Sequence, residues 1–367
     1  MNELSSPMNR YGLRDRVTTE LSEFLDGQER TLGAVSPDLS AVVRALRDFL
    51  DGGKRMRPAF CYWGWRAGAG PEPDEPAVLR GAAALELLQA SALIHDDYMD
   101  GSDTRRGAPA IHRRFEALHR DGGWQGPAER FGAAAAILLG DITLTWCDEM
   151  FTRCGLPAER IHAARPVFDL MRSEVMAGQY LDVLAQARGL NVSTPEQILG
   201  RARTVLRYKS AKYTVERPLQ LGAALATGTA GGPLADALSA YGLPLGEAFQ
   251  LRDDVLGVFG DPAATGKPAG DDLREGKQTV LVAQAAARAG RAQLAALRSG
   301  VGDPDLDADG VARLCRIITE TGALDLVEAE IADLAEQAGK ALGTAPITAE
   351  SREVLEELAV AATARQG

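Results

Sequence analysis

Residues 85–100 read LELLQASALIHDDYMD, a run of strong helix formers that ends in a cluster of aspartates. Because residues four apart share a helix face, the carboxylates of Asp96 and Asp100 are expected side by side, with Asp97 next to them. Like charges at this spacing weaken a helix, and Asp is itself a poor residue for a helix interior. Such a cluster predicts that a cation neutralises it. Oxygen ligands with room left for water and phosphate are typical of Mg²⁺ sites.

A second aspartate cluster, DDVLG at 253–257, also lies in an apolar, helix-like segment. Basic residues flank both clusters: GGKRMRP at 52–58, the pair Arg105 and Arg106, and, after the second cluster, Lys267 and Lys277. Carboxylates bind metal, metal binds phosphate, and Arg and Lys take the remaining phosphate oxygens. The pattern predicts a metal-bridged diphosphate together with a second anion site.

At these motifs the chain resembles the trans-isoprenyl diphosphate synthases (polyprenyl synthetases), most of all the bacterial geranylgeranyl diphosphate synthases. The resemblance runs from about residue 36 to the C-terminus. It rests on GGKRMRP at 52–58, the first cluster with its arginine pair at 96–106, GQYLD at 178–182, Lys212, FQLRDD at 249–254, Lys267 and Lys277.

The resemblance implies an all-α domain, residues 36–367, in which about a dozen helices surround a central active-site cavity. The two aspartate clusters are expected on facing helices of this single bundle. Residues 1–35 are expected to form a polar N-terminal extension with one amphipathic helix around 16–25. Abundant Ala and Leu with only 5% aromatic residues also favour packed helices over sheets.

The activity implied is that of a prenyltransferase, which condenses isopentenyl diphosphate with an allylic diphosphate. The allylic diphosphate ionises, the double bond of isopentenyl diphosphate attacks the cation, and a proton is lost to the departing diphosphate. No protein general base is required. The cofactor implied is Mg²⁺, about three ions per active site, with Mn²⁺ able to replace it.

The resemblance also assigns roles to individual residues. The residues expected to be catalytic are Asp96, Asp100, Asp253 and Lys212, and the metal ligands among them are Asp96, Asp100 and Asp253. The residues expected to bind isopentenyl diphosphate are Lys54, Arg57, Gln89 and Arg106. The residues expected to bind the allylic diphosphate are Arg105, Lys212, Gln250, Lys267 and Lys277.

Product length is expected to depend on the helix that precedes the first cluster. Ser91 and Ala92, one turn before Asp96, are small, so a growing chain can pass them. Leu88 lies one turn further, about 5.4 Å along the axis, close to one isoprene unit. This chain-length pocket favours a twenty-carbon product, geranylgeranyl diphosphate. Longer products are expected if the residues that close the end of the pocket lie on another helix.

The chain departs from the family pattern at three positions. Gly257 stands where the second motif usually ends in Asp, which predicts a weaker hold on one metal ion. Lys212, Tyr213 and Thr214 replace the usual adjacent Lys-Thr pair, and Gln89 occupies a position that is His in some relatives.

Composition limits the partners and the compartment. The net charge of −11 disfavours nonspecific binding to nucleic acid or anionic membranes. Four scattered cysteines suit a reducing cytosol, and no segment has the 18–20 uncharged apolar residues expected of a membrane span. A cytoplasmic protein that binds small isoprenyl diphosphates is expected, with a homodimer implied by the family.

Two other functions stay open. A class I terpene cyclase shares the fold and the first aspartate motif, although it needs no second diphosphate site of the kind that GGKRMRP and Arg106 provide. A noncatalytic subunit of a heteromeric synthase would usually lack the aspartates that this chain retains.

Overall fold

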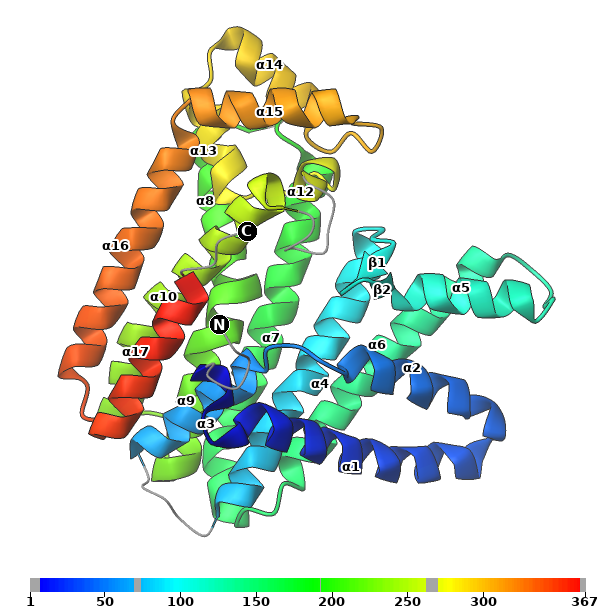
Figure 1. The fold of residues 1–367 in the computed structure, drawn as a ribbon, viewed down its shortest axis with the longest axis vertical. Helices are drawn as coiled ribbons and strands as arrows, with labels where there is room; N and C mark the ends of the chain where they lie inside the picture. Colours follow the sequence, from blue (N-terminus) through cyan, green and yellow to red (C-terminus); the bar gives the residue numbers. More distant parts are fainter. Residues whose placement is uncertain (1–6, 69–73, 192, 262–269, 364–367) are drawn as a thin grey trace. The chain divides into compact units, whose positions relative to one another are not determined.

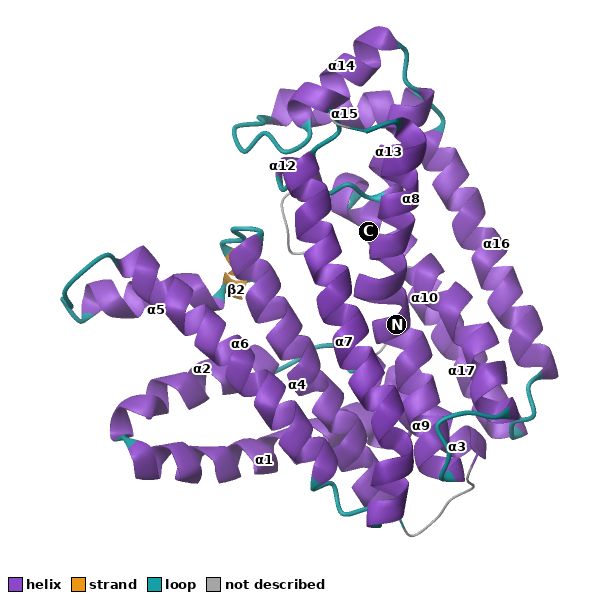
Figure 2. Cartoon of the chain, turned by 180° about the vertical axis from the view of Figure 1, so that it is seen from behind, coloured by secondary structure: helices purple, strands orange, loops and turns teal. Residues whose placement is uncertain are grey.

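The computed structural model describes residues 7–68, 74–191, 193–261 and 270–363. Helices make up nearly all of this part of the chain, which confirms the expected all-α class (Figures 1 and 2). The chain forms two compact units. Unit 1 comprises Met1–Asp169, Arg217–Leu238 and Ala345–Leu358, and unit 2 comprises Leu170–Glu216, Ser239–Thr344 and Ala359–Gly367.

Unit 1 contains the first aspartate cluster. Its complete helices are α1 (Leu13–Val35), α2 (Ser40–Leu50), α3 (Met56–Gly68), α4 (Glu75–Met99), α5 (Ile111–Asp121), α6 (Ala128–Thr152) and α9 (Arg217–Thr227). The first parts of α7 (Ala158–Arg188), α10 (Pro233–Phe259) and α17 (Ala349–Thr363) also belong to it. A short ribbon, β1 (Thr104–Arg105) paired antiparallel with β2 (Ala108–Pro109), joins α4 to α5.

Unit 2 contains the second aspartate cluster. It holds the later parts of α7, α10 and α17, and a π-helical segment, Leu206–Glu216. Its complete α-helices are α8 (Pro195–Val205), α12 (Asp271–Arg274), α13 (Val280–Arg288), α14 (Arg291–Gly300), α15 (Ala308–Glu320) and α16 (Ala323–Thr344). Leu251 and Val255 of α10 are buried in one apolar cluster with Leu281 of α13 and Ile318 of α15. The carboxylates at 253–254 are therefore carried on a helix that is fixed by its apolar face.

The N-terminal helix α1 is longer than the amphipathic helix expected around residues 16–25. Leu13, Val17, Leu21 and Leu25 of α1 recur every four residues and are all buried. A spacing of four keeps apolar side chains on one helix face, which packs against α4 within unit 1. The domain boundary at residue 36 stays a prediction.

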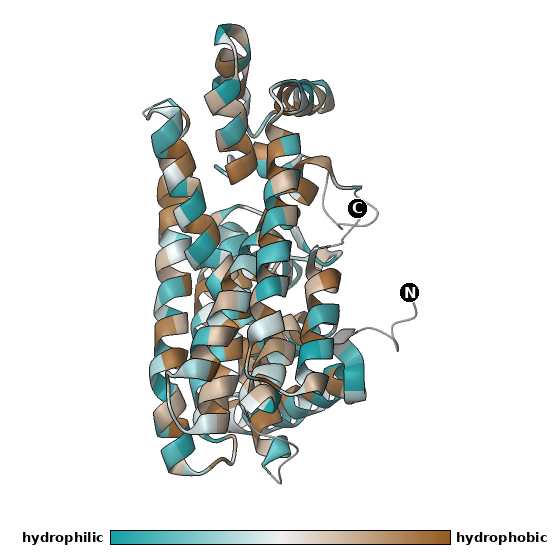
Figure 3. Ribbon diagram, turned by 90° about the vertical axis from the view of Figure 1, so that its left-hand side faces the viewer, coloured by the Kyte–Doolittle hydropathy of each residue, from teal (hydrophilic) through white to brown (hydrophobic). Residues whose placement is uncertain are grey.

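Other helix boundaries follow the local signals in the sequence. The Thr194 hydroxyl accepts from the backbone N–H of Gln197 while the Gln197 side chain accepts from the Thr194 N–H, and this capping box begins α8. Most helices carry both hydrophobic and hydrophilic residues (Figure 3), as helices that bury one face do.

Two helices of unit 1, α4 and α6, are long and apolar enough to cross a membrane by length and composition. Each apolar stretch contains a charged residue, Glu86 in α4 and Asp141 in α6, so neither is an uncharged segment of the kind that the sequence was expected to lack. Of the most apolar stretch of each helix, 72% is buried in α4 and 44% in α6, and the two helices pack side by side (Figure 1). Core helices of water-soluble proteins pass the same test, so it gives weak evidence for a membrane span. The cytoplasmic location stays a prediction.

Candidate active site

The first aspartate cluster occupies the last turn of α4. Asp97 is fully buried, Asp96 is 9% exposed, and Asp100 ends the helix by donating its backbone N–H to the Asp96 carbonyl over 2.8 Å. Gly101 follows with a φ of 69°, a left-handed conformation that turns the chain away from the helix. The helix therefore presents its carboxylates at its C-terminal end, where negative charge is least favourable.

The arginine pair after this cluster is set by the ribbon of β1 and β2, which the sequence did not predict. Arg106 and Gly107 form its turn with φ values of 54° and 77°, as in a type I′ hairpin. Arg105, in β1, donates from Nε to Asp97 Oδ1 over 2.8 Å. The hairpin thus gives the two adjacent arginines different surroundings, and Arg105, expected at the allylic diphosphate, is paired with Asp97.

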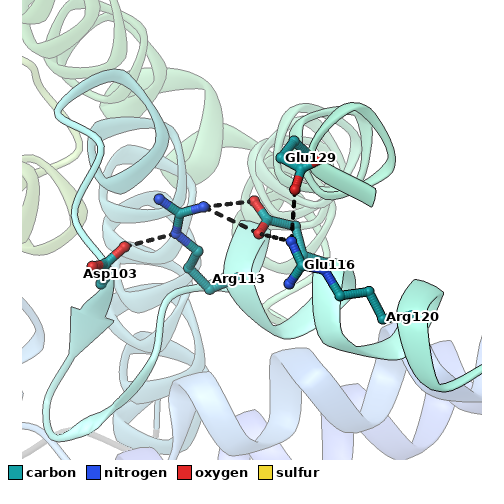
Figure 4. A network of polar contacts seen from close by, with 5 residues as sticks. All are labelled: Asp103, Arg113, Glu116, Arg120 and Glu129. Atoms are coloured by element: carbon teal, nitrogen blue, oxygen red, sulfur yellow. Dashed lines mark hydrogen bonds and ion pairs between the residues drawn. The ribbon is translucent and has the colours of Figure 1, made fainter. Parts of the chain in front are cut away.

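A polar network ties the start of this ribbon to α5 and α6 (Figure 4). Arg113 of α5 donates to Asp103 over 2.7 Å and to Glu116 over 2.9 Å. Arg120 donates to Glu116 over 3.2 Å and to Glu129 of α6 over 2.7 Å. Asp103 lies three residues after Asp100, so the network anchors the segment between the aspartates and the arginine pair.

The GGKRMRP segment and Arg106 meet at one hollow in unit 1. The hollow is small and open to solvent, and its lining includes Phe49, Leu93, Arg55, Glu86, Gln89 and Arg106. Two residues expected to bind isopentenyl diphosphate, Gln89 and Arg106, are therefore brought together. The other two belong to the segment that enters α3, with Lys54 exposed and Arg57 half-buried.

Arg106 lies against the backbone of this segment. A Cβ at Gly53 would stand 3.1 Å from the Arg106 guanidinium nitrogens, so the absence of a side chain there makes room for the arginine. Partial desolvation lowers the pKa of Arg106, Glu86 opposes this shift, and the cations Arg55, Arg105 and Arg57 add to it. Crowded positive groups with one carboxylate among them give this hollow a basic lining. We call it the anion hollow, because it is the candidate anion site of unit 1.

The residues expected to form the chain-length pocket differ in burial. Ser91 and Leu88 are fully buried within unit 1, whereas Ala92 is half-buried. Ala92 also lies one helical turn before Asp96, on the same face. Of the three, Ala92 is the position that α4 leaves partly accessible.

The second aspartate cluster lies on α10 in unit 2. Asp253 is half-buried, and Asp254 is buried and accepts from Gln250 Nε2 over 2.8 Å. Burial raises the pKa of Asp254 well above its usual range, and the nearby carboxylates of Asp272 and Asp253 raise it further. Gln250, expected at the allylic diphosphate, is thus engaged with a carboxyl group of its own helix.

The lysines of unit 2 are also paired with carboxylates. Lys212, in the π-helical segment, donates to Glu216 over 2.9 Å, and Lys277 lies 2.6 Å from Glu275. π-helical turns are frequently found at functional sites. Lys267 lies outside the described residues.

Lys209 was missed in the sequence. It donates to Asp182 of the GQYLD segment over 2.6 Å and, like Lys212, is part of the π-helical segment. The signal available was its position three residues before Lys212, which puts both near one face of any helix.

Glu86 was also missed, although it is a single acid in the apolar stretch LELLQ. A charge in such a stretch predicts a buried partner. His95, the residue before the first aspartate cluster, forms a hydrogen bond from Nε2 to the backbone carbonyl of Ile137 over 3.2 Å.

Over residues 7–68, 74–191, 193–261 and 270–363, no group of three or more His, Cys, Asp or Glu side chains is gathered as a set of metal ligands. The oxygen donors of Asp96 and Asp100 on one helix turn nevertheless fit Mg²⁺. This ion usually takes one or two carboxylates and completes its shell with water and substrate phosphate. The expected arrangement of the two clusters on facing helices stays a prediction.

Comparison with known proteins identifies the family. The polyprenyl synthetase family model matches residues 40–318. The chain is 32% identical to a geranylfarnesyl diphosphate synthase of Aeropyrum pernix over 83% of this chain and 87% of that one. It is also 32% identical to a geranylgeranyl diphosphate synthase of Methanosarcina mazei over 78% of each chain.

A solved structure shows the same fold. The geranylgeranyl pyrophosphate synthase of Corynebacterium glutamicum, complexed with isoprenyl diphosphate and magnesium, superposes with a TM-score of 0.91 and 43% identity. The match covers 96% of this chain and 99% of that one, which establishes the all-α isoprenoid synthase fold. The chain therefore belongs to the polyprenyl synthetase family and is a prenyltransferase.

Proposed function

We propose that the protein condenses isopentenyl diphosphate with an allylic diphosphate and releases geranylgeranyl diphosphate and inorganic diphosphate. The observation that supports this most directly is the anion hollow of unit 1, where Gln89 and Arg106 lie together beside Arg55 and Glu86. A cyclase acting on a single diphosphate needs no such second site. The relatives named as geranylgeranyl and geranylfarnesyl synthases support the reaction class and leave twenty or twenty-five carbons open.

The reaction breaks the C–O bond of the allylic diphosphate, whose electron pair leaves with the diphosphate. The double bond of isopentenyl diphosphate supplies the electron pair of the new C–C bond, and the proton lost afterwards passes to the departing diphosphate. Arg106, Gln89, Lys54 and Arg57 hold the diphosphate of isopentenyl diphosphate. This anchoring restricts the double bond to one orientation, which converts an encounter between two substrates into a step within one complex.

The leaving diphosphate is held by the residues around the two aspartate clusters. Mg²⁺ bound by Asp96, Asp100 and Asp253 would neutralise the negative charge that develops on it. Lys212, Lys267 and Lys277 add positive charge, and the carboxylates now paired with Lys212 and Lys277 orient these ammonium groups. The apolar side of α4, with Leu93 in the hollow, keeps water from the carbocation.

The test is incubation of the purified protein with Mg²⁺, isopentenyl diphosphate and farnesyl diphosphate, followed by chromatography of the dephosphorylated products. A twenty-carbon linear alcohol is expected. A cyclic hydrocarbon formed without isopentenyl diphosphate would identify a terpene cyclase, and no product from the protein alone would identify a noncatalytic subunit. A twenty-five-carbon product would retain the reaction and correct the chain length.

We further propose that the protein is a homodimer that uses the outer face of α6. Ile137 and Leu138 of this helix are 48% and 63% exposed, so α6 offers apolar surface that a second copy of the chain could cover. Light scattering is expected to give twice the chain mass of 39.0 kDa. Leu138→Glu is expected to shift the protein toward the monomer, and a monomeric native protein would refute the proposal.

A further inference from the structure

Arg55 is a buried cation beside the anion hollow whose guanidinium is held by protein groups. Its side chain is 1% exposed, Nη1 donates to Glu86 Oε2 over 2.7 Å, and Nη2 donates to the Leu50 carbonyl over 2.6 Å. Glu86 is equally buried, with 2% of its side chain exposed. The pair joins α4, which carries Glu86, to the segment between α2 and α3.

The backbone at Arg55 is in a conformation that a residue with a side chain rarely adopts. Its φ is 53°, and Gly53 two residues earlier has a φ of 90°. Left-handed backbone at a non-glycine residue persists only where its surroundings hold it in place. The hydrogen bonds from the Arg55 guanidinium to Glu86 and to the Leu50 carbonyl stabilise this backbone conformation.

Glu86 is the one carboxylate among the residues that line the anion hollow. A negative charge there opposes anion binding by direct electrostatic repulsion. Glu86 is therefore expected to have a role other than contact with the anion. The segment fixed by Arg55 includes Gly53, against which Arg106 packs, and Lys54 and Arg57 on either side of Arg55.

We propose that Glu86 and Arg55 are positioning residues for the diphosphate of isopentenyl diphosphate. Glu86 fixes Arg55, Arg55 fixes the turn at 52–57, and the turn places Arg106, Lys54 and Arg57 around the anion. The substrate named here rests on the proposed function, whereas the positioning of a diphosphate does not. Neither residue needs to touch the ligand.

Positioning and direct electrostatics predict opposite signs for one substitution. If Glu86 acts only through its charge, Glu86→Gln removes a negative group and tightens diphosphate binding. If it positions Arg55, Glu86→Gln loosens the turn and weakens binding. Glu86→Asp retains the charge but draws the carboxylate back by one methylene, so only the positioning role predicts weaker binding.

The experiment measures binding of inorganic pyrophosphate by calorimetry, and KM and kcat for both substrates, in the full-length enzyme. Both Glu86 variants are expected to raise the Kd for pyrophosphate and the KM for isopentenyl diphosphate about tenfold, with the KM for the allylic substrate within about twofold. The matched controls are Glu20→Gln and Glu20→Asp. They alter an ion pair of 2.7 Å from Glu20 to Arg80 on the same helix α4, away from the hollow, and are expected to leave all three constants unchanged.

Tighter or unchanged pyrophosphate binding in Glu86→Gln would overturn the inference, as would unchanged binding in Glu86→Asp. Should Glu86→Gln fail to fold, as judged by thermal melting, the conservative Glu86→Asp carries the test. Native protein that binds pyrophosphate but makes no prenyl product would refute the proposed function and leave the positioning role to be decided by the Kd values.

Discussion

A Cβ at position 257 would collide with the carboxylate of Asp272. Gly257 is the position where the family motif usually ends in Asp, so the carboxylate of a different segment, α12, lies where that side chain would begin. Asp272 also acts on Asp254, whose pKa it raises, and lies 3.7 Å from Lys277. The motif therefore lacks its own carboxylate at position 257, and the carboxylate of Asp272 lies close to that position.

Restoring the family residue is therefore expected to harm the enzyme. Gly257→Asp should displace the Asp272 carboxylate, lower kcat at least about tenfold and raise the Mg²⁺ concentration needed for half-maximal activity. The melting temperature should change little, because the displaced atoms are the end of a side chain. Mg²⁺ titration of activity and thermal melting measure these effects. Gly200→Asp, at an exposed glycine of the same unit with nothing within 4 Å of its Cβ position, is the control and should be nearly neutral. Higher activity in Gly257→Asp would contradict the steric argument.

The adjacent aspartates of α4 are expected to respond differently to replacement. Asp96→Ala, like Asp253→Ala in the second cluster, should lower kcat by at least about a hundredfold with little change in melting temperature, because a ligand for metal is lost. Asp97 is fully buried and paired with Arg105, so Asp97→Ala should also cost about 1–3 kcal/mol of unfolding free energy. Activity that persists in excess chelator, or equal melting temperatures for Asp96→Ala and Asp97→Ala, would refute this division.

At the scale of elements, three groups of functional residues lie along the single helix α4. Arg80 and Glu86 tie it to α1 and to the turn before α3, Gln89 and Leu93 line the anion hollow, and the last turn presents the aspartates. Because a helix rises about 1.5 Å per residue, these groups keep fixed separations along its axis. Burial of its Leu and Ala residues fixes its rotation about that axis.

Product length is expected to change when the accessible position of α4 is enlarged. Ala92→Phe should shorten the main product from twenty to fifteen carbons and leave stability nearly unchanged, because this site is half-buried. Ser91→Phe should also shorten the product, at a further cost of about 1–3 kcal/mol, because Ser91 is fully buried. Chromatography of dephosphorylated products and melting curves provide the measurements. If the Ala92→Phe enzyme is active and its product is as long as the native one, residues of another helix must form the end of the chain-length pocket.

At the scale of the whole molecule, Lys54 and Arg57, expected at isopentenyl diphosphate, and Lys212, expected at the allylic diphosphate, come from different units. Lys54 and Arg57 belong to unit 1, whereas Lys212 belongs to unit 2. Lys54→Ala and Arg57→Ala are expected to raise the KM for isopentenyl diphosphate about tenfold or more and that for the allylic substrate much less, since each removes one charged contact. Lys212→Ala and Lys267→Ala should show the opposite bias. Steady-state kinetics with each substrate varied separately decide the matter, and equal effects of all four changes on both substrates would refute two separate sites.

The features that depend on near neighbours along the chain could be predicted from the sequence. The all-α class, the cap of α8 at Thr194 and the position of Asp96 and Asp100 on one helix turn all follow from hydrogen bonds and side-chain contacts within a few residues. The order of the basic and acidic motifs was enough to indicate the family, because it too is a property of the chain alone.

Which charged groups pair with one another could not be predicted, because it depends on contacts that form when the chain folds. Neighbours in GGKRMRP differ completely: Lys54 is exposed, whereas Arg55 is buried on Glu86, 31 residues away. Arg105 meets Asp97 through a hairpin whose turn carries no Asn-Gly or Asp-Gly signal, and Asp272 fills the space at Gly257 from another helix. These pairings form between segments that folding brings together, and the free energy of a charge depends on its burial and partners, which residue identity does not specify.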